Sequence, residues 1–222
     1  MPGYSFSKGM FGPLDERYFR LIDRSGDMAS EIDWSGLERE RVFERFQEIF
    51  NSERNVRKEA YFDSMTHFDF KCLLPARLQV EDRTSMAHGL ESRVPLLDAS
   101  IVEFAATIPA DIKFRGGRMK HFLKSTFETN LPSELVERRD KMGFPVPLQE
   151  WFAGDLRDMV GDVFSAQKQK HREHFNSEAI LANFDKAERF SRKTWGLLSL
   201  ELWHRQFHDR AAEFQRIALA RQ

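Results

Sequence analysis

A charged segment near the middle of the chain holds residue types that could act on a substrate. The segment EDRTSMAHGLESRVPLLD, Glu81 to Asp98, carries acidic and basic side chains at Glu81, Asp82, Arg83, Glu91 and Arg93. If it is helical as far as Gly89, the first two carboxylates lie one to two turns from Glu91, where arginines can pair with them. Apolar residues keep a helical spacing in the same segment. Two interpretations stay open: a buried ion-pair network that fixes a corner between helices, or a wall of a substrate site.

A second segment places a lysine on a stiff loop between two helices. In RRDKMGFPVPLQEW, Gly143, Pro145 and Pro147 interrupt regular structure close to Lys141. A lysine held on such a loop is a point charge that can meet a phosphate or a developing oxyanion. The same pattern is also that of a surface lysine on a turn, so the residues alone leave both interpretations open.

Other catalytic and metal-binding patterns are absent from the sequence. There is no GxxxxGK followed by Ser or Thr and no GxGxxG after a strand, so the chain has no recognisable phosphate cradle of its own. His171 and His174 stand three residues apart in a charged connection without a third ligand, and we expect no metal site there. Ser85, His88 and Glu91 share one helical face, but nothing supplies the oxyanion site that a catalytic triad needs.

The elements that must position these residues are predicted to be helices. Apolar residues recur at helical spacing nearly everywhere, and no convincing alternation at period two appears. Asp98 is expected to cap a helix that stops before Pro109. The predicted helices cover residues 37–50, 101–105, 119–127, 133–139, 148–163, 180–187 and 195–217. We therefore predict an all-α fold with a helical lead-in segment (1–60), a core with the motif loops (61–164) and a helical tail (165–222), joined by a polar surface connection at 164–175.

Composition and charge exclude several classes of function. The 222 residues include 34 Lys and Arg against 35 Asp and Glu, so no bulk charge points to nucleic acid or to a membrane surface. The 21 Phe indicate an aromatic-rich core. No run approaches the ~18 apolar residues that would span a bilayer. Cys72 is the single cysteine, expected to act as a small buried hydrophobe, and the absence of any internal disulfide suits a reducing, cytoplasmic compartment.

Three longer stretches together resemble a known family. LLPARLQVEDRTSMAHGLESRVPLLD, RMKHFLKSTF and LPSELVERRDKMGFPVPLQEW agree in order, spacing and residue type with the C-terminal part of glutamine-hydrolysing asparagine synthetases. The agreement extends from about Tyr61 to Trp151, and the tail WGLLSLELWHRQF is similar to the closing helix of bacterial members. The segment before Tyr61 matches less distinctively.

The resemblance implies an ATP-dependent carbon–nitrogen ligase. Members of the family join an N-terminal glutaminase to a synthetase domain of the adenine nucleotide α-hydrolase-like (PP-loop ATPase) type. That domain uses ATP and Mg²⁺ to adenylate aspartate, and ammonia from glutamine then displaces AMP to give asparagine. The chain contains no Ser-Gly-Gly-x-Asp-Ser and does not begin with Met-Cys. We therefore expect it to be the helical C-terminal segment without the nucleotide-binding sheet, inactive alone and without tightly bound ATP or Mg²⁺.

The resemblance also implies roles for individual residues. Lys141 falls on the family lysine of Arg-x-Lys-x-x-Phe, which is thought to neutralise charge that builds on the α-phosphate. Glu91 and Arg93 match the LExRxPxLD core, and Lys120 lies on a further family lysine. Glu81, Asp82 and Arg83 fall where the family turns toward its substrate pocket. These six residues beside Lys141 are assigned to substrate binding or to shaping the pocket.

Two alternatives to an asparagine synthetase stay open. Relatives that close β-lactam rings use the same lysine with an internal amine in place of ammonia, and other paralogues amidate different carboxylates. A free-standing helical interaction module would keep the corner only as architecture. The expected partners are the small substrates and the missing glutaminase and nucleotide-loop regions. An apolar face left uncovered by that missing sheet also makes self-association an expectation.

Overall fold

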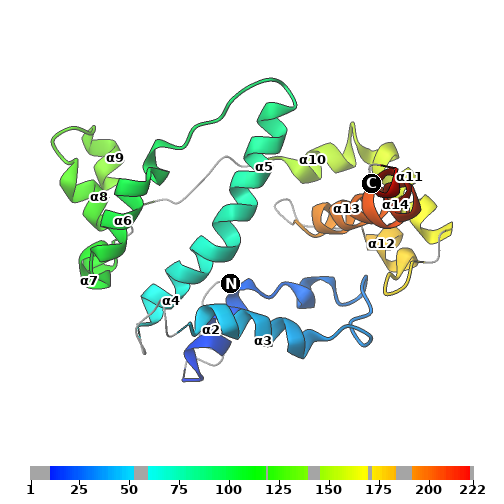
Figure 1. Ribbon diagram of the computed structural model, residues 1–222, viewed down its shortest axis with the longest axis horizontal. Coiled ribbons are helices and arrows are strands. Elements are labelled where there is room, and N and C mark those ends of the chain that lie inside the picture. Colours follow the sequence, from blue (N-terminus) through cyan, green and yellow to red (C-terminus); the bar gives the residue numbers. More distant parts are fainter. Residues whose placement is uncertain are drawn as a thin grey trace. The chain divides into compact units, whose positions relative to one another are not determined.

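The computed structural model describes residues 11–52, 60–118, 120–139, 146–169, 172–183 and 192–220 (Figure 1). Every regular element in these ranges is a helix or a helical turn. The one β-type pairing that the described ranges contain is an isolated bridge between Ile32 and Phe175. The all-α prediction is thus confirmed for the described chain. The chain divides into two compact units, of which unit 1 comprises residues 1–21 and 40–142, and unit 2 comprises residues 22–39 and 143–222.

Unit 1 begins with an aromatic cluster built by three short helices. These are α2 (Leu14–Ile22), α3 (Arg39–Phe50) and α4 (Tyr61–Phe68). Their apolar faces bury Tyr18, Phe46 and Phe50, against which the rings of further aromatic residues pack. The Tyr18 and Phe50 rings stack with centroids 5.5 Å apart, and Phe68 meets Phe46 edge-on at 4.9 Å. Such ring geometries add to the stabilisation that burial itself provides.

A proline sets the shape of the long helix that follows. Helix α4 continues through the π-turn η2 (Asp69–Leu73) into α5 (Leu74–Met86), as Figure 1 shows. Pro75 has no N–H and its ring would clash with the carbonyl four residues earlier, so the helix widens and Leu74 N–H donates to the carbonyl of Asp69. The Tyr18 hydroxyl donates to the Asp69 carboxylate at 2.6 Å and ties the turn to α2. Cys72 lies half-buried in this turn, and burial raises the pKa of its thiol.

The remainder of unit 1 consists of short helices with little buried apolar surface. They are η3 (Pro95–Leu97), α6 (Ala99–Thr107), α7 (Ala110–Lys113), η4 (Arg115–Gly117), α8 (His121–Thr126) and α9 (Ser133–Glu137). As predicted, the Asp98 side chain caps α6 by accepting from the Ser100 N–H at 3.0 Å, and α6 ends before Pro109. Ile108 and Val136 are buried in this part, whereas most other large apolar side chains are not.

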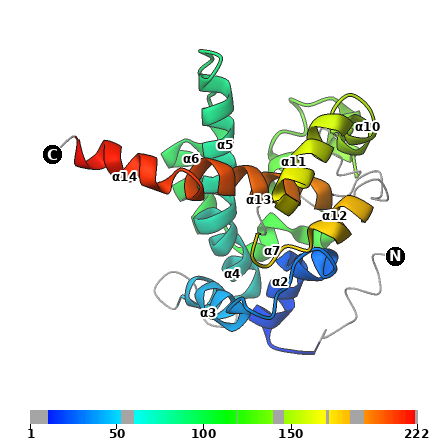
Figure 2. The ribbon, with the colours of Figure 1, turned by 90° about the vertical axis from the view of Figure 1, so that its right-hand side faces the viewer.

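Unit 2 has a denser core. Its elements are η1 (Ser25–Met28), α10 (Leu148–Ala153), α11 (Arg157–Gln169), α12 (Ser177–Asn183), α13 (Lys193–Trp203), the π-turn η6 (His204–His208) and α14 (Ala211–Leu219). The core consists of Ile32, Phe152, Val160, Val163, Phe164, Ile180, Leu197 and Leu198. Figure 2 shows α13 continuing through η6 into α14 as one extended arm.

A buried charge network fastens this arm to the rest of unit 2. Glu201 on α13 is fully buried, and the Arg172 guanidinium donates to both of its carboxylate oxygens. Arg172 also grips Asp209 with two hydrogen bonds, at 2.7 and 2.9 Å. Arg205 donates to Glu201 at 2.8 Å and to the carbonyl of Val163 at 2.7 Å. The expected surface connection is therefore wrong at Arg172, whose side chain is only 13% exposed, because two carboxylates satisfy its charge.

Two of the predicted helices are each divided in the structure. The apolar pattern of residues 148–163 continues across Gly154, but the backbone of that glycine leaves helical geometry and separates α10 from α11. Residues 195–217 form α13, η6 and α14 in place of one uninterrupted α-helix. Unit 2 also joins residues from the predicted lead-in and tail segments, and the three-segment division itself stays a prediction.

Candidate functional site

The corner that follows α5 is built by a glycine. Gly89 has a φ of 67°, a conformation that L side chains rarely adopt. Its N–H donates to the carbonyl of Met86, and the N–H of Leu90 donates to that of Ser85, both at 3.0 Å. These two bonds form a Schellman motif, which satisfies the last carbonyls of the helix and turns the chain. The sequence from Leu90 therefore leaves the helix axis at a fixed place.

Glu91 and Arg93 meet immediately after this corner. Arg93 donates to Glu91 at 2.9 Å, with side chains 80% and 69% exposed respectively. Pro95 then begins η3, and Asp98, the N-cap of α6, follows directly after it. A pair this exposed contributes about 0–1 kcal/mol. The interpretation of the corner as a buried ion-pair network is thus wrong for the described chain, since both charges face outward.

The three charged residues on α5 are also exposed. Among the described residues, the side chains of Glu81, Asp82 and Arg83 take part in no hydrogen bond or ion pair. The Ser85 hydroxyl donates to the carbonyl of Glu81 at 2.8 Å, so it serves the helix backbone. With Glu91 paired to Arg93, the arrangement offers no support for a triad of Ser85, His88 and Glu91. The α5 charges are instead a solvated set that another surface can bind.

Lys120 stands at a strained position. It precedes α8 with a φ of 57°, and the turn before it holds Gly116 and Gly117 at 62° and 71°. Glycine adopts such angles freely, but a lysine there carries a Cβ penalty. Non-glycine residues in this region cluster at functional sites, where the surrounding structure must hold them. The geometry is compatible with the predicted role of Lys120 in binding.

Another lysine, on α8, contacts the chain just after α9. The Lys124 ammonium donates to the carbonyl of Arg138, just after α9, at 2.5 Å. Lys141 itself lies outside the described residues. The structure therefore brings Glu91 and Arg93 together, places residues 81–83 on α5 and Lys120 at the start of α8, and leaves the catalytic prediction at Lys141 as a prediction.

The described residues contain neither a cluster of cation ligands nor the sequence pattern of a pyrophosphate loop. No group of three or more His, Cys, Asp or Glu side chains that could hold a cation comes together in the described ranges. The positive-φ turn at Gly116 and Gly117 belongs to Arg-Gly-Gly-Arg and lacks the Ser-Gly-Gly-x-Asp-Ser pattern of a pyrophosphate loop. ATP and Mg²⁺ thus remain expectations for the larger protein that the resemblance implies.

Among the described residues, two buried carboxylates with cationic partners belong to unit 2, whereas the predicted substrate-binding residues belong to unit 1. Glu31 and Glu201 are fully buried in unit 2, and sequence reasoning singled out neither of them. Glu201 had a usable signal, because it interrupts the apolar run LLSLELW on the inner face of a helix. Glu31 stands in the short irregular stretch SEIDW, where no periodicity could mark it as buried.

Comparison with known proteins assigns the chain to a family. The family model described as asparagine synthase matches residues 12–205. The chain belongs to the asparagine synthase family. The match includes the α5 corner, Lys120 and Lys141.

Individual relatives are all much longer than the matched part. The glutamine-hydrolysing asparagine synthetase 1 of Bacillus subtilis (strain 168) is 30% identical over 159 residues, which cover 69% of this chain and 24% of that protein. A putative asparagine synthetase of Mycobacterium tuberculosis H37Rv is 30% identical over 149 residues, or 64% of this chain and 22% of the relative. The human asparagine synthetase is 31% identical over 105 residues, or 46% and 17%. The chain thus spans about a quarter of the length of the bacterial relatives.

Two negative findings complete these results. No solved structure matches the chain. Within the described ranges, none of the helices is long and apolar enough to cross a membrane.

Proposed function

We propose that this chain is the helical C-terminal portion of an ATP-dependent synthetase that amidates the side-chain carboxylate of aspartate to give asparagine. One observation carries the proposal: the family match extends over residues 12–205 and so includes every predicted site residue. The glutamine-hydrolysing relatives support glutamine as the source of ammonia. A PP-loop ATPase-like sheet and a glutaminase, both from outside these residues, would complete the enzyme.

In this proposal the chain's own residues supply fixed charge and shape. Lys141 meets the negative charge that develops during acyl transfer, which a positioned ammonium stabilises more than the ground state. Lys120, held at positive φ, presents a second cation near the substrate. Glu91 and Arg93 shape the pocket beside them, and the α5 residues Glu81, Asp82 and Arg83 form part of the surface that faces the other half of the enzyme.

The exposed apolar side chains of unit 1 support the need for that other half. Val80, Met86, Leu90, Leu96 and Phe104 are all more than half exposed. Exposed apolar side chains mark interaction surfaces when they form a large patch. We propose that the nucleotide-binding part covers them, and that residues 1–222 alone self-associate and release no pyrophosphate. A concentration-independent monomer in sedimentation would contradict the first expectation, and turnover by the isolated chain would contradict the second.

The deciding experiment uses the protein encoded by the full reading frame that contains this chain. It should release pyrophosphate with ATP, Mg²⁺, aspartate and ammonia, and Lys141→Ala should lower kcat about 100-fold or more. Lys71→Ala, which removes an exposed cation outside the site, is the matched control and should keep the activity. Circular dichroism must show that both variants are folded. Unchanged turnover in Lys141→Ala would reject the catalytic assignment and favour a helical interaction module.

The requirement for a nitrogen source distinguishes the remaining alternatives. An asparagine synthetase requires ammonia or glutamine, whereas a β-lactam-forming relative closes its own substrate without them. If pyrophosphate release is independent of both nitrogen sources, the amidation proposal fails. If the reading frame encodes no Ser-Gly-Gly-x-Asp-Ser pattern, its ATP-dependent half fails.

A further inference from the structure

Helix α8 carries a lysine whose side chain reaches the end of a second helix. Lys124 is half-buried, and its ammonium donates to the carbonyl of Arg138 at 2.5 Å. Arg138 is the C-cap of α9, and with a φ of −54° and a ψ of 121° its backbone leaves helical geometry. The bond joins positions 14 residues apart in the sequence and holds α8 beside the end of α9, as Figure 1 shows.

Apolar packing does little to hold the end of α9. Val136 is the one buried residue of that helix, and α8 has none. The Phe122 ring of α8 lies against the Phe104 ring of α6, with their centroids 6.3 Å apart. Because so little apolar surface is buried here, the directed bond from Lys124 is the contact best suited to give the end of α9 one position. Bonds from a charged donor are stronger than those between neutral groups.

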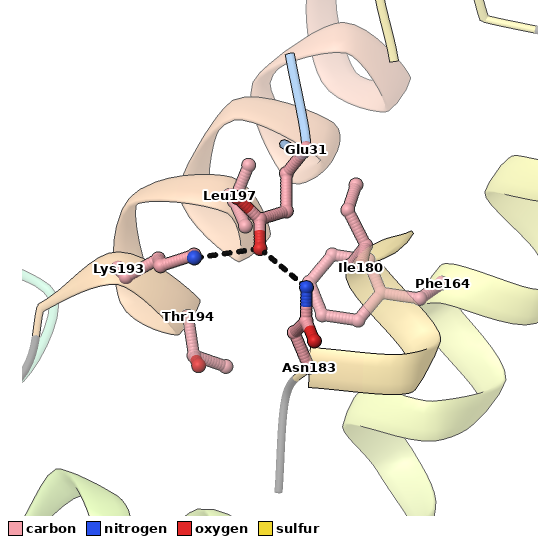
Figure 3. A pocket seen from close by; sticks show the side chains of 7 residues that line it. All are labelled: Glu31, Phe164, Ile180, Asn183, Lys193, Thr194 and Leu197. Atoms are coloured by element: carbon pink, nitrogen blue, oxygen red, sulfur yellow. Dashed lines mark hydrogen bonds and ion pairs between the residues drawn. The ribbon is translucent and has the colours of Figure 1, made fainter. Parts of the chain in front are cut away.

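A lysine of unit 2 shows a different use of the same group. Lys193 binds the buried carboxylate of Glu31 at 2.6 Å, so that each charge neutralises the other (Figure 3). The carbonyl that accepts from Lys124 is neutral, so no buried charge requires a cation at that place. A cation near the end of a helix can satisfy terminal carbonyls, which is a role in stability. The bond also fixes a position, which can serve function.

We propose that Lys124 is a positioning residue for Lys141, an inference that rests on the catalytic role proposed above for that lysine. Arg138 precedes Lys141 by three residues, which can span at most about 11 Å. The Lys124 bond fixes the point from which this short span begins. The N–H of Lys124 also donates to the carbonyl of Lys120 at 2.9 Å. One short helix thus carries both the predicted substrate-binding lysine and the support of the catalytic one.

The test compares variants of the protein encoded by the full reading frame. Lys124→Met keeps the apolar stem but cannot donate, and kcat should fall about 10- to 100-fold, because a misplacement of about 1 Å can cost a factor of that size. The KM values for ATP and aspartate should stay close to those of the wild type, since Lys141 acts on charge that develops in the transition state. Lys124→Arg can also donate to a carbonyl and should restore most of the turnover. Lys71→Met is the matched control, because it removes an exposed lysine of η2 outside the site.

A double-mutant cycle separates positioning from a purely structural role. In a Lys141→Ala background the bond has no catalytic group left to position, so adding Lys124→Met should change kcat little. A helix cap that only stabilises unit 1 would lower the melting temperature and leave kcat unchanged in assays run well below it. The proposal is overturned by an unchanged kcat in Lys124→Met, by a Lys124→Arg variant no faster than Lys124→Met, or by independent losses in the double variant.

The same measurements separate this inference from the proposed function. If the wild-type protein releases no pyrophosphate with ATP, Mg²⁺, aspartate and ammonia, the proposed function fails and the positioning role fails with it. If Lys141→Ala keeps full activity, the catalytic assignment and the positioning role fail together. If Lys141→Ala loses activity while Lys124→Met keeps it, only the positioning role fails.

Discussion

Unit 2 and the site-bearing part of unit 1 bury their side chains to very different extents. Among the described residues of 61–139, only Ile108 and Val136 are buried apolar residues. Unit 2 encloses a contiguous core of eight buried apolar residues and pairs its buried charges with arginine and lysine. The predicted substrate-binding residues all belong to residues 61–139 of unit 1, and their side chains are exposed.

The difference shows which part of this chain buries its apolar side chains and pairs its charges without another protein surface. Unit 2 satisfies its own apolar and charged groups, so it has the features of a folded scaffold. The segments that carry Glu81, Glu91 and Lys120 leave apolar side chains in water, and covering such a surface lowers the free energy. The proposed function interprets that surface as the inner wall of a larger active site.

The tryptophans and tyrosines allow the two units to be followed separately. All four Trp, at positions 34, 151, 195 and 203, belong to unit 2, and all three Tyr, at positions 4, 18 and 61, belong to unit 1. Tryptophan fluorescence therefore reports the unfolding of unit 2. Near-UV circular dichroism in the tyrosine region, together with far-UV circular dichroism, reports the unfolding of unit 1.

The same substitution in the two regions should have the largest difference in effect. Phe164 is completely buried in unit 2, so Phe164→Ala should lower the free energy of unfolding by about 3–5 kcal/mol. Phe104 on α6 is 59% exposed, so Phe104→Ala should change it by about 0.5 kcal/mol or less. Urea titrations followed by both signals measure the two effects. Equal losses would show that the α6 region has a core of its own and would remove the contrast.

Removing a buried charge should have the next largest effect. Glu201→Gln leaves the Arg172 and Arg205 guanidinium groups without their shared carboxylate, and we expect a loss of about 3 kcal/mol in the stability of unit 2. The control is Glu213→Gln, which breaks the exposed pair between Arg210 and Glu213. That variant should unfold at the wild-type urea concentration. A wild-type midpoint for Glu201→Gln as well would mean that the network contributes no net stability.

Local patterns in the sequence predicted several of the helices but not their junctions, and α2 and α4 were not among the predicted helices. Apolar spacing reports which face of a segment can be buried, and it marked residues that are buried in α3 and α11, whereas the apolar residues that it marked in α6 are not buried. It continues unchanged across Gly154 and across the π-turn η6, where only the backbone departs from α-helical geometry. The π-turn at Asp69–Leu73 did have a local cause in Pro75, whose effect on a continuous helix is known.

The site could be predicted only as a set of residue types in order. Glu91 and Arg93 are two residues apart, and their pairing depends on the corner that Gly89 makes. The exposure of Glu81 to Arg83 could not be predicted, because burial depends on what else covers the helix. Arg172 and Glu201 are 29 residues apart in sequence, and no pairwise pattern at that distance distinguishes a clamp from two surface charges.

Acid should weaken unit 2 by titrating its clamps. Burial raises the pKa of Glu201, but hydrogen bonds from Arg172 and Arg205 outweigh it, so the pKa lies below its ordinary value of 4.5, as it does for Glu31. A carboxylate with a depressed folded-state pKa contributes stability above its unfolded-state pKa and loses it as the pH falls through the folded value. Tryptophan-monitored unfolding should therefore show declining stability below about pH 4.5.

The variant Glu201→Gln is the control for this acid effect. It has no carboxylate at position 201, so its stability should depend less steeply on pH in the same range. Parallel curves for the wild type and the variant would show that Glu201 does not titrate on unfolding. The contrast between the two units would then rest on apolar packing alone.

The smallest expected effect concerns the strained lysine of unit 1. Lys120→Gly removes the Cβ penalty at a φ of 57°, against the greater chain entropy of glycine when unfolded, so stability should rise by up to about 1 kcal/mol. Arg118→Gly, at a φ of −84°, relieves no strain and should lower stability by about 0.5–1 kcal/mol. Opposite signs in far-UV circular dichroism melts would show that unit 1 maintains Lys120 against its own preference. If Lys120→Gly also lowers the turnover of the full-length enzyme, the strain serves the site and not the fold. If both glycine variants are equally destabilised, the lysine side chain stabilises the turn, and its conformation carries no functional information.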